Sequence, residues 1–530
     1  MKPSSDNAEE DSEVKQPPKP PQNWDRCHAY LERKKRFCRQ QRQASSVFCG
    51  NHQHLEVSPS KSNGRKRIPC PLDPSHMIYE DMVDKHILIC PRAKKRKRQE
   101  ALPYFKENVN CGGCGSLCAE RTPFRDETKS LEWAQRIALR VLQVHQKLFQ
   151  GTSTKSSNEK SPSLMTLNDL YEAIPLRDHS QQEMDAGIAE SFQSNRIKSG
   201  GSRHVPQLAS LVGHLRAMEV LPQLGKIKHA PPADKPLVLL EMGAGRGMFG
   251  LTAAGVAGAG SLQTHLVMLE RTGSRSKADK IFRSLPKHDS TDSSYLKLDE
   301  VHWSRIGCDL SHVDLPRVLS KGDIDDPKIV VIAKHLCGAG TDLALKSLEP
   351  IKERLNACIL ATCCHGVCDW KEYVGRDFLR KEMEDGDEGI LFGSTEFDLL
   401  RRWCAGAVAC QSAKNDAKVD PSSVHTQNEI NVEHSNAPTN EFPSDKGVNI
   451  SSIVCSLNLH CGIQGLGRAC QRLIDYGRLE YLRSEIFSNT ITATVDLCHY
   501  VPSGVSPQNA ALVAYHRQGK CGSIITEKAR

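Results

Sequence analysis

Long hydrophobic runs are missing from this sequence. No stretch of about 18 consecutive apolar residues occurs, which argues against a membrane-spanning helix. Segment 1–21 is polar and rich in proline, so it lacks the apolar core of a secretory signal. We therefore expect a protein that is neither membrane-embedded nor secreted, with no membrane partner, and that resides in the nucleus, the cytoplasm or both.

Aromatic residues are scarce at 5% of the chain, and all hydrophobic residues together make up only 38%. A chain of 530 residues with this composition is expected to combine one large core with sizeable unfolded stretches. Segments 1–23 and 411–450 are rich in residues such as Pro, Ser, Asn and Asp and poor in large apolar residues. We predict that both segments are disordered.

Most of the chain has no net charge. Residues 101–530 carry 50 basic and 50 acidic side chains, whereas residues 1–100 carry 21 basic and 13 acidic ones. The basic excess therefore lies at the N-terminal end, where it favours a polyanionic partner such as nucleic acid. The run Lys94–Arg98 has three open interpretations: a nuclear-import signal, a contact with an RNA backbone, or a solvated linker.

The cysteine count is odd, at 21, and no secretory signal accompanies it, so a disulfide framework is not expected. Cysteines near the N-terminus alternate with histidines in two groups of four. The groups are Cys27, Cys38, Cys49 and His52 in segment 24–54, and Cys70, His76, His86 and Cys90 in segment 67–92. Four sulfur and nitrogen ligands are the tetrahedral set that Zn²⁺ prefers. In the first group, His28 and His54 are alternatives to His52.

The size of these segments supports the zinc interpretation. A segment of about 30 residues buries too little apolar surface to fold alone. A structural zinc supplies about 10–16 kcal/mol of binding free energy, which such a module can use for folding. The sequence therefore predicts two small zinc modules, followed by a basic linker over 93–129.

The remainder of the chain alternates short apolar runs with helical periodicity. A helical region over 130–235, interrupted by the polar loop 151–163, precedes a larger domain over 236–520. Helices are predicted at 130–149, 203–220 and 467–484. Strands are predicted at 237–241, 265–270, 301–308, 329–333, 358–362, 491–500 and 510–516. This alternation is typical of an α/β fold with a parallel sheet, and the last two strands can pair antiparallel.

A glycine-rich turn follows the first predicted strand and opens a helix. The residues that we expect to hold a cofactor are Glu241, Gly243, Gly245 and Gly247 at this turn, Glu270 at the end of the second strand, and Asp309 after the third. The glycines allow a sharp turn and a close approach to the ligand, and Glu270 can accept both hydroxyls of a ribose. Asp309 is either an adenine contact or a helix cap.

Glycine triplets occur in nicotinamide, flavin and S-adenosylmethionine enzymes alike. An acidic residue directly before the glycines resembles the first motif of class I methyltransferases more than the dinucleotide fingerprint. The predicted fold is therefore α/β, of the class I (Rossmann-like) S-adenosylmethionine methyltransferase type, with two small N-terminal zinc modules. The predicted antiparallel strand at the end of the domain also suits this fold.

Two polar segments follow the fourth and fifth strands, where ligands bind in parallel sheets. They read KHLCGAGTD (334–342) and TCCHGVCDW (362–370). Three interpretations are open: His335 and His365 bind or deprotonate a substrate hydroxyl, a cysteine acts as a nucleophile as in cytosine C5 methylation, or Cys337, Cys364, His365 and Cys368 hold a metal. Cys363 can also be a small buried hydrophobic residue.

Several motifs together resemble one family. The two N-terminal modules, KHLCGAGTDLAL, ATCCHGVCDW, GRACQRLIDYGRLEYL and RHVPQLASLVGHL are similar to eukaryotic tRNA 2′-O-methyltransferases that modify the fourth nucleotide of the acceptor stem. The resemblance covers most of residues 24–95 and 200–516. It implies methyl transfer from S-adenosylmethionine to a ribose 2′-hydroxyl of tRNA, with zinc in the N-terminal modules.

Within this framework we expect His335 and His365 near the reacting centre, with Asp342 as an orienting group. Arg468, Arg472 and Arg478 on a late helix are predicted phosphate contacts, or else ordinary surface charge. Two alternatives remain: a zinc-finger RNA-binding protein with a vestigial methyltransferase domain, and an enzyme that methylates a base.

Overall fold

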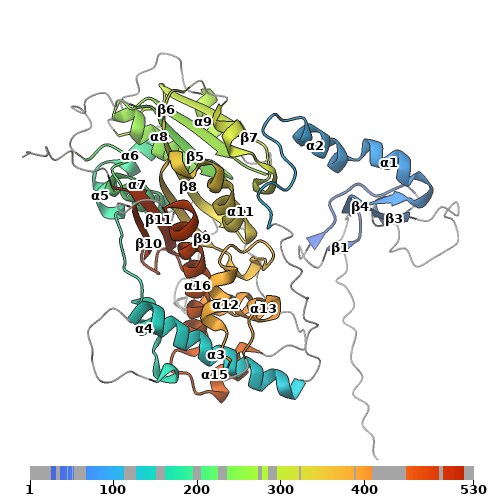
Figure 1. Ribbon diagram of the computed structural model, residues 1–530. Coiled ribbons are helices and arrows are strands. Elements are labelled where there is room, and N and C mark those ends of the chain that lie inside the picture. Colours follow the sequence, from blue (N-terminus) through green and yellow to red (C-terminus); the bar gives the residue numbers. More distant parts are fainter. Residues whose placement is uncertain are drawn as a thin grey trace, which may run out of the picture. The chain divides into compact units, whose positions relative to one another are not determined.

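The computed structural model divides the chain into two compact units, Met1–Leu102 and Pro103–Arg530 (Figure 1). The residues that it describes are 25–31, 36–44, 46–50, 52, 67–112, 127–150, 161–194, 204–224, 235–271, 277–284, 295–320, 324–386, 390–408, 449–488 and 493–517. The predicted disorder of 1–23 and 411–448 falls outside this set. No helix among the described residues combines the length and apolar composition needed to span a bilayer.

The first unit contains two small antiparallel ribbons and two helices. Its elements are β1 (Tyr30–Leu31), β2 (Arg36–Phe37), β3 (Arg67–Cys70), β4 (Asp73–Tyr79), a 3₁₀ turn (Glu80–Met82), α1 (Val83–Ile89) and α2 (Pro91–Glu100). Its two cores consist largely of cysteine: one holds Cys27, Ala29, Cys38 and Cys49, and the other holds Cys70, Ile78 and Cys90. Cores of this size need further stabilisation, as the sequence predicted.

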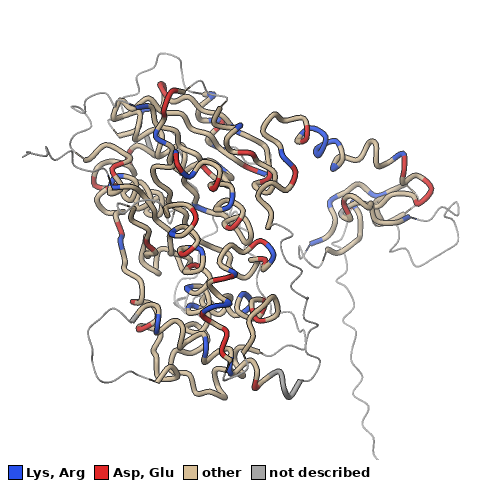
Figure 2. Tube along the Cα trace, viewed as in Figure 1, with Lys and Arg blue, Asp and Glu red and all other residues tan. Residues whose placement is uncertain are grey.

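The basic run lies on a helix where the sequence predicted a linker. Helix α2 begins with Pro91 at its first position, which suits a residue that lacks an N–H donor. All five residues of Lys94–Arg98 are exposed, and Figure 2 shows blue along the trace of α2, where these basic residues follow one another. Arg96 also pairs with Glu100 one turn later, at 2.6 Å.

A sheet of seven strands forms the centre of the second unit. The strands are β5 (Leu237–Met242), β6 (Thr264–Leu269), β7 (Val301–Ile306), β8 (Lys328–Cys337), β9 (Leu355–Cys363), β10 (Ala493–His499) and β11 (Ala510–His516). Their order across the sheet is β10-β11-β9-β8-β5-β6-β7. The five strands β5 to β9 are parallel, whereas β11 runs antiparallel to both β9 and β10. All seven predicted strands are present, and the predicted antiparallel pair is confirmed.

Helices cover the sheet and extend beyond it. They are α3 (Glu127–Gln150), α4 (Leu167–Tyr171), α5 (Ser180–Asp185), α6 (Ile188–Ser194), α7 (His204–Ala217), α8 (Met248–Ala259), α9 (Lys277–Ser284), α10 (Leu315–Leu319), α11 (Ala339–Leu348), α12 (Arg376–Met383), α13 (Ser394–Trp403), α15 (Ile450–Ser456) and α16 (Gly462–Tyr481). The three predicted helices correspond to α3, α7 and α16. The last two residues of the predicted 411–450 insertion are ordered instead: Asn449 caps α15, and Ile450 is the first residue of that helix.

Two hydrophobic clusters organise this unit. Helices α7, α8 and α9 pack with one face of the sheet in the first cluster, whereas α3, α13 and α16 form the second. Helix α3 is therefore part of the same unit as the sheet. Part of the predicted linker is folded as well, because the Asn110 side chain donates to the carbonyl oxygens of Leu310 and Val313, at 2.6 and 2.8 Å.

Candidate functional site

The glycine loop joins β5 to α8 at the carboxyl end of β5, the middle one of the five parallel strands. Gly243, Gly245 and Gly247 have φ angles of 60°, 50° and 73°, in the left-handed region that favours glycine. A Cβ on Gly243 would lie 2.6 Å from Leu336 Cδ2, and one on Gly247 would lie 2.8 Å from Ala278 Cβ. A Cβ on Gly245 would meet only a backbone oxygen, 3.9 Å away, among the described residues. The loop is therefore open at Gly245.

Glu270 directly follows β6 and is tied to this loop. The Gly245 N–H donates to Glu270 Oε2 at 2.8 Å, which fixes the carboxylate beside the open position. A carboxylate held at this point can accept hydrogen bonds from ribose hydroxyls.

Asp309 caps the 3₁₀ turn Leu310–His312, which was one of its two predicted roles. Its Oδ1 accepts hydrogen bonds from the Ser311 N–H and hydroxyl, at 3.1 and 3.0 Å. Its Oδ2 lies 3.8 Å from Arg271 Nη1. The other role, a contact with adenine, stays a prediction.

Glu241 lies behind the glycine loop and is 3% exposed. Its Oε2 has no hydrogen-bond partner among the described residues, and Gly250 leaves room for the carboxylate, since a Cβ there would lie 2.5 Å from this atom. Burial raises the pKa of Glu241 to about 8. Burial also lowers the pKa of Lys334 to about 8, although the nearby Glu241 partly offsets this decrease. A buried unpaired oxygen beside a glycine turn marks a place for a polar ligand group.

Arg305 and Asp279 support the loop, and the sequence analysis missed both. Arg305 Nε lies 2.8 and 3.0 Å from the two carboxylate oxygens of Asp279, and its Nη1 donates to the Gly245 carbonyl at 3.2 Å. Asp279 is 3% exposed. The only sequence signal was an arginine inside the predicted strand 301–308.

The two polar segments meet at the carboxyl ends of β8 and β9. Leu336 pairs with Thr362 and Cys337 with Cys363, after an irregularity in β8 between Ala333 and Leu336. This register brings together the segments that the sequence singled out, as expected for neighbouring parallel strands.

The two predicted catalytic histidines lie in different surroundings. His335 is exposed, and the adjacent Lys334 Nζ lies 3.3 Å from His204 Nδ1 on α7. His365 is 2% exposed. Of the two residues, only His335 is exposed to solvent.

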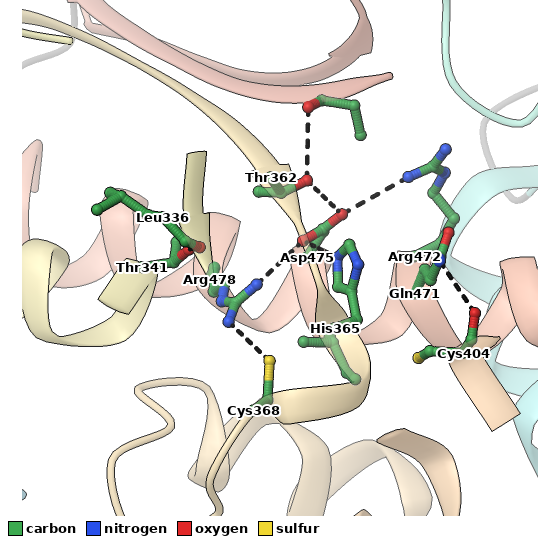
Figure 3. Close-up of polar contacts among 12 residues, drawn as sticks. Leu336, Thr341, Thr362, His365, Cys368, Cys404, Gln471, Arg472, Asp475 and Arg478 are labelled. Carbon is green, nitrogen blue, oxygen red and sulfur yellow. Dashed lines mark hydrogen bonds and ion pairs between the residues drawn. The ribbon is translucent and has the colours of Figure 1, made fainter. Parts of the chain in front are cut away.

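His365 belongs to a buried polar network (Figure 3). Its Nε2 lies 2.8 Å from Asp475 Oδ1, and the Thr362 hydroxyl donates to Asp475 Oδ2 at 3.0 Å. Burial raises the pKa of Asp475, but the interactions with His365 and with the guanidinium groups of Arg478 and Arg472 outweigh it, so the pKa is lowered. The stability that this carboxylate contributes is present at neutral pH and is lost as the pH falls below its ordinary pKa.

Asp342 is linked to the same network through an arginine. Arg478 donates to both carboxylate oxygens of Asp342, at 3.1 and 2.7 Å, and lies 3.3 Å from Asp475 and 3.2 Å from Cys368 Sγ. The side chains of Asp342, Arg478 and Asp475 are all fully buried. Asp342 can thus orient His365 only indirectly. The sequence analysis missed Asp475, although its spacing of three residues from Arg472 and from Arg478 is a helical ion-pair pattern.

The prediction that Arg468, Arg472 and Arg478 bind phosphate is wrong. Their exposed fractions are 1%, 1% and 0%, because α16 packs inside the unit. Arg468 lies over the Tyr171 ring, 5.1 Å from its centroid. These arginines are internal parts of the fold.

The interpretation that Cys337, Cys364, His365 and Cys368 together hold a metal, one of the three left open by the sequence, is wrong. His365 and Cys368 contact the Asp475–Arg478 network instead. Cys337 and Cys364 gather with Cys363, with Sγ atoms of Cys337 and Cys364 3.3 Å apart.

In the first unit the predicted CCCH ligands come together. The ligand atoms of Cys27, Cys38, Cys49 and His52 lie within 4.8 Å of one another. His52 Nδ1 is 3.4 Å from Cys27 Sγ and 3.3 Å from Cys49 Sγ. His28 is not part of this cluster, and His54 lies outside the described residues.

The predicted CHHC ligands also converge within 4.8 Å. Cys70 Sγ lies 3.3 Å from His86 Nε2 and 3.8 Å from Cys90 Sγ, while the Nε2 atoms of His76 and His86 are 3.0 Å apart. Two of the four ligands come from the β3–β4 ribbon, and two come from α1 and the residue after it. Four such atoms around one point fit a tetrahedral Zn²⁺.

These features define an α/β protein with a glycine loop and two polar segments at the carboxyl ends of its parallel strands, and with two N-terminal clusters of metal-type ligands. Residues 206–515 match the family described as methyltransferase TRM13. Residues 25–53 match the CCCH zinc finger in TRM13 protein, and residues 67–91 match the U11-48K-like CHHC zinc finger. The chain belongs to the TRM13 methyltransferase family and carries both zinc finger domains.

Similar proteins match nearly the whole chain. The "tRNA:m(4)X modification enzyme TRM13 homolog" of Mus musculus is 26% identical, covering 92% of this chain and 94% of its own length. The "tRNA:m(4)X modification enzyme TRM13" of Saccharomyces cerevisiae is 24% identical, covering 93% and 96%. The Homo sapiens homolog is 25% identical, covering 92% and 94%.

Proposed function

We propose that this protein is a class I methyltransferase that transfers a methyl group from S-adenosylmethionine to the ribose 2′-hydroxyl of the fourth nucleotide in the tRNA acceptor stem. The observation that carries the proposal is the open glycine loop with Glu270 bonded to Gly245, in a chain of this family. The names of the relatives, which are called tRNA:m(4)X modification enzymes, support tRNA as the substrate.

The sheet supports the class I assignment. Its last strand, β11, runs antiparallel and lies between β9 and β10. The first strand of the series, β5, is the middle one of the five parallel strands β5 to β9, so that its glycine loop lies between the ends of β6 and β8, where ligands bind in parallel sheets.

The residues present fit S-adenosylmethionine. Gly245 leaves space in the loop, Glu270 is fixed to accept ribose hydroxyls, and Glu241 has an unpaired oxygen behind the loop. When bound, this cofactor supplies an electrophilic methyl group.

The chain must position the attacking ribose oxygen and help to remove its proton. His335 is the proposed proton acceptor, because it is exposed at the end of β8. His365 is a proposed positioning residue, since Asp475 holds its ring inside the fold next to the β9 terminus.

The two zinc modules are proposed to bind tRNA. The exposed basic side chains of α2 supply charge for phosphate contacts, and the metal would give the adjacent ribbons a fixed shape. The same run is a candidate nuclear-import signal, so the proposed location is the nucleus, the cytoplasm or both.

Methyl mapping on a defined substrate tests the proposed reaction. An unmodified tRNA transcript is incubated with the protein and isotopically labelled S-adenosylmethionine, and nucleosides from mapped fragments are identified by mass spectrometry. We expect the label on a ribose at the fourth nucleotide.

A matched substrate with a 2′-deoxyribose at that nucleotide alone should accept no methyl group there, because the attacking oxygen is missing. Labelled base in either substrate, or a covalent adduct with a 5-fluoropyrimidine at that position, would establish base methylation and overturn the proposal.

Disruption of the second zinc module tests tRNA recruitment. Replacing Cys70 and Cys90 together with serine should release one equivalent of zinc and unfold the module, because its core consists mainly of these cysteines. Affinity for tRNA should fall, and its dependence on salt concentration should flatten as phosphate contacts are lost. S-adenosylmethionine affinity should survive, since the glycine loop belongs to the other unit.

Cys111→Ser is the matched control, because Cys111 is a cysteine outside every metal-type cluster among the described residues. If the double variant binds and methylates tRNA like the parent at several salt concentrations, the modules do not recruit tRNA.

A further inference from the structure

Three thiols converge at the carboxyl edge of the sheet, outside both zinc modules. Cys337 ends β8, Cys363 ends β9, and Cys364 follows it directly. The Cys337 Sγ lies 3.8 Å from Cys363 Sγ and 3.3 Å from Cys364 Sγ, and all three sulfur atoms lie within 4.8 Å of one another. Such a cluster is a potential ligand set.

The backbone builds this cluster from both sides. The parallel register pairs Cys337 with Cys363, which places their side chains next to each other. Cys364 has a φ of 49°, a left-handed conformation that is uncommon for a residue with a side chain. This turn allows the next side chain along the chain to join the pair instead of pointing to the opposite face of the strand.

The distance between the Sγ atoms of Cys337 and Cys363, 3.8 Å, matches that of two thiolates around one ion, and the Sγ atoms of Cys337 and Cys364 lie closer, at 3.3 Å. Ligands at about 2.3 Å from a tetrahedral Zn²⁺ lie roughly 3.8 Å apart. The zinc finger modules of this chain show the same spacing: 4.0 Å between Cys38 and Cys49, and 3.8 Å between Cys70 and Cys90. The three-thiol cluster therefore has the dimensions of a mononuclear site.

The coordination would be incomplete on the solvent side. Cys363 is buried, whereas Cys337 and Cys364 are exposed. In the part of the chain that the structure describes, no further histidine, cysteine or carboxylate places a ligand atom within 4.8 Å of all three sulfurs. Three protein ligands with an open fourth position are the arrangement of catalytic rather than structural zinc sites.

We propose that Cys337, Cys363 and Cys364 form a third metal site, which binds one thiophilic divalent cation such as Zn²⁺ and leaves its fourth position to water or another small oxygen ligand. The ion ties the ends of β8 and β9 together beside His335. This site goes beyond the proposed methyl transfer, and its occupancy is measured without any assay of that reaction.

Metal counting on the full chain tests the site. The protein is reduced, saturated with Zn²⁺, freed of excess metal and analysed by elemental mass spectrometry. We expect three zinc ions per chain in the parent and two in Cys337→Ser and in Cys364→Ser. Cys455→Ser is the matched control, because Cys455 is equally exposed but belongs to no cluster among the described residues, and it should keep three. Two zinc ions in the reduced parent would overturn the proposal.

A measurement on the unsubstituted protein covers the case in which a serine variant fails to fold. Native alkylation followed by peptide mass spectrometry should show Cys337 and Cys364 protected by Zn²⁺ and reactive after chelation, while Cys455 reacts equally in both states. Replacement of zinc by Co²⁺ should add thiolate charge-transfer absorption for a third site. If Zn²⁺ leaves the alkylation of Cys337 and Cys364 unchanged, or if the Co²⁺ absorption accounts for only two sites, no such site exists. A disulfide between Cys337 and Cys364 that persists under reducing conditions would also overturn the proposal.

Discussion

Gly245→Asp should abolish measurable binding of S-adenosylmethionine while the protein stays folded. The substitution places a carboxylate in the open part of the glycine loop, next to Glu270, whose Oε2 accepts the Gly245 N–H. Like charge and lost space both act against the ligand, and the φ of 50° strains any residue with a side chain. Titration calorimetry measures the affinity.

Gly504→Asp provides the control for the added charge, since a Cβ there would meet no described atom within 4 Å. That variant should bind the cofactor like the parent, and both variants should unfold cooperatively. Unchanged affinity in Gly245→Asp would show that the loop does not hold the cofactor.

Asp342→Asn should destabilise the second unit by about 3–5 kcal/mol, because it leaves the fully buried Arg478 short of a charged partner. Asp475 remains 3.3 Å from Arg478 but already pairs with His365, so it cannot replace both bonds to Asp342. The thermal unfolding midpoint should fall by several degrees.

The comparison variant is Asp377→Asn, which breaks a pair with Arg380 in which the aspartate side chain is fully exposed. Its midpoint should equal that of the parent, since solvent screens such pairs. Equal midpoints for Asp342→Asn and the parent would mean that the buried pair contributes nothing to stability.

Hydrophobic pattern and motif spacing were sufficient to predict the strands, the glycine loop and both zinc ligand sets. Apolar runs separated by helices determine a parallel sheet, and ligand spacing within about 30 residues is a local property. The placement of Glu241, Glu270 and the three glycines at the carboxyl ends of β5 and β6 could be predicted, because these residues adjoin apolar runs in the sequence.

The polar interior could not be predicted in the same way. Arg468, Arg472 and Arg478 look like surface charge, because arginine is rarely buried without partners. Their burial depends on residues distant in sequence: Asp342 lies 136 residues from Arg478, and His365 lies 110 from Asp475. The turn at Cys363–Cys364 could not be predicted either, since no sequence pattern indicates that a cysteine will adopt the left-handed backbone conformation.

The position of β11 has a consequence for how the protein is made. This strand spans Ala510–His516 and leaves the ribosome after the six other described strands of the sheet, yet it lies inside the sheet and bonds β9 on one side and β10 on the other. Until it emerges, β9 presents an open edge, which is a template for pairing with other chains. Strand β9 ends at Cys363, about 150 residues before β11 begins. The nascent chain therefore carries unpaired backbone groups along the β9 edge while these residues are synthesised. Completion of the sheet, and with it burial of the β9 edge, is a late event set by the C-terminal residues.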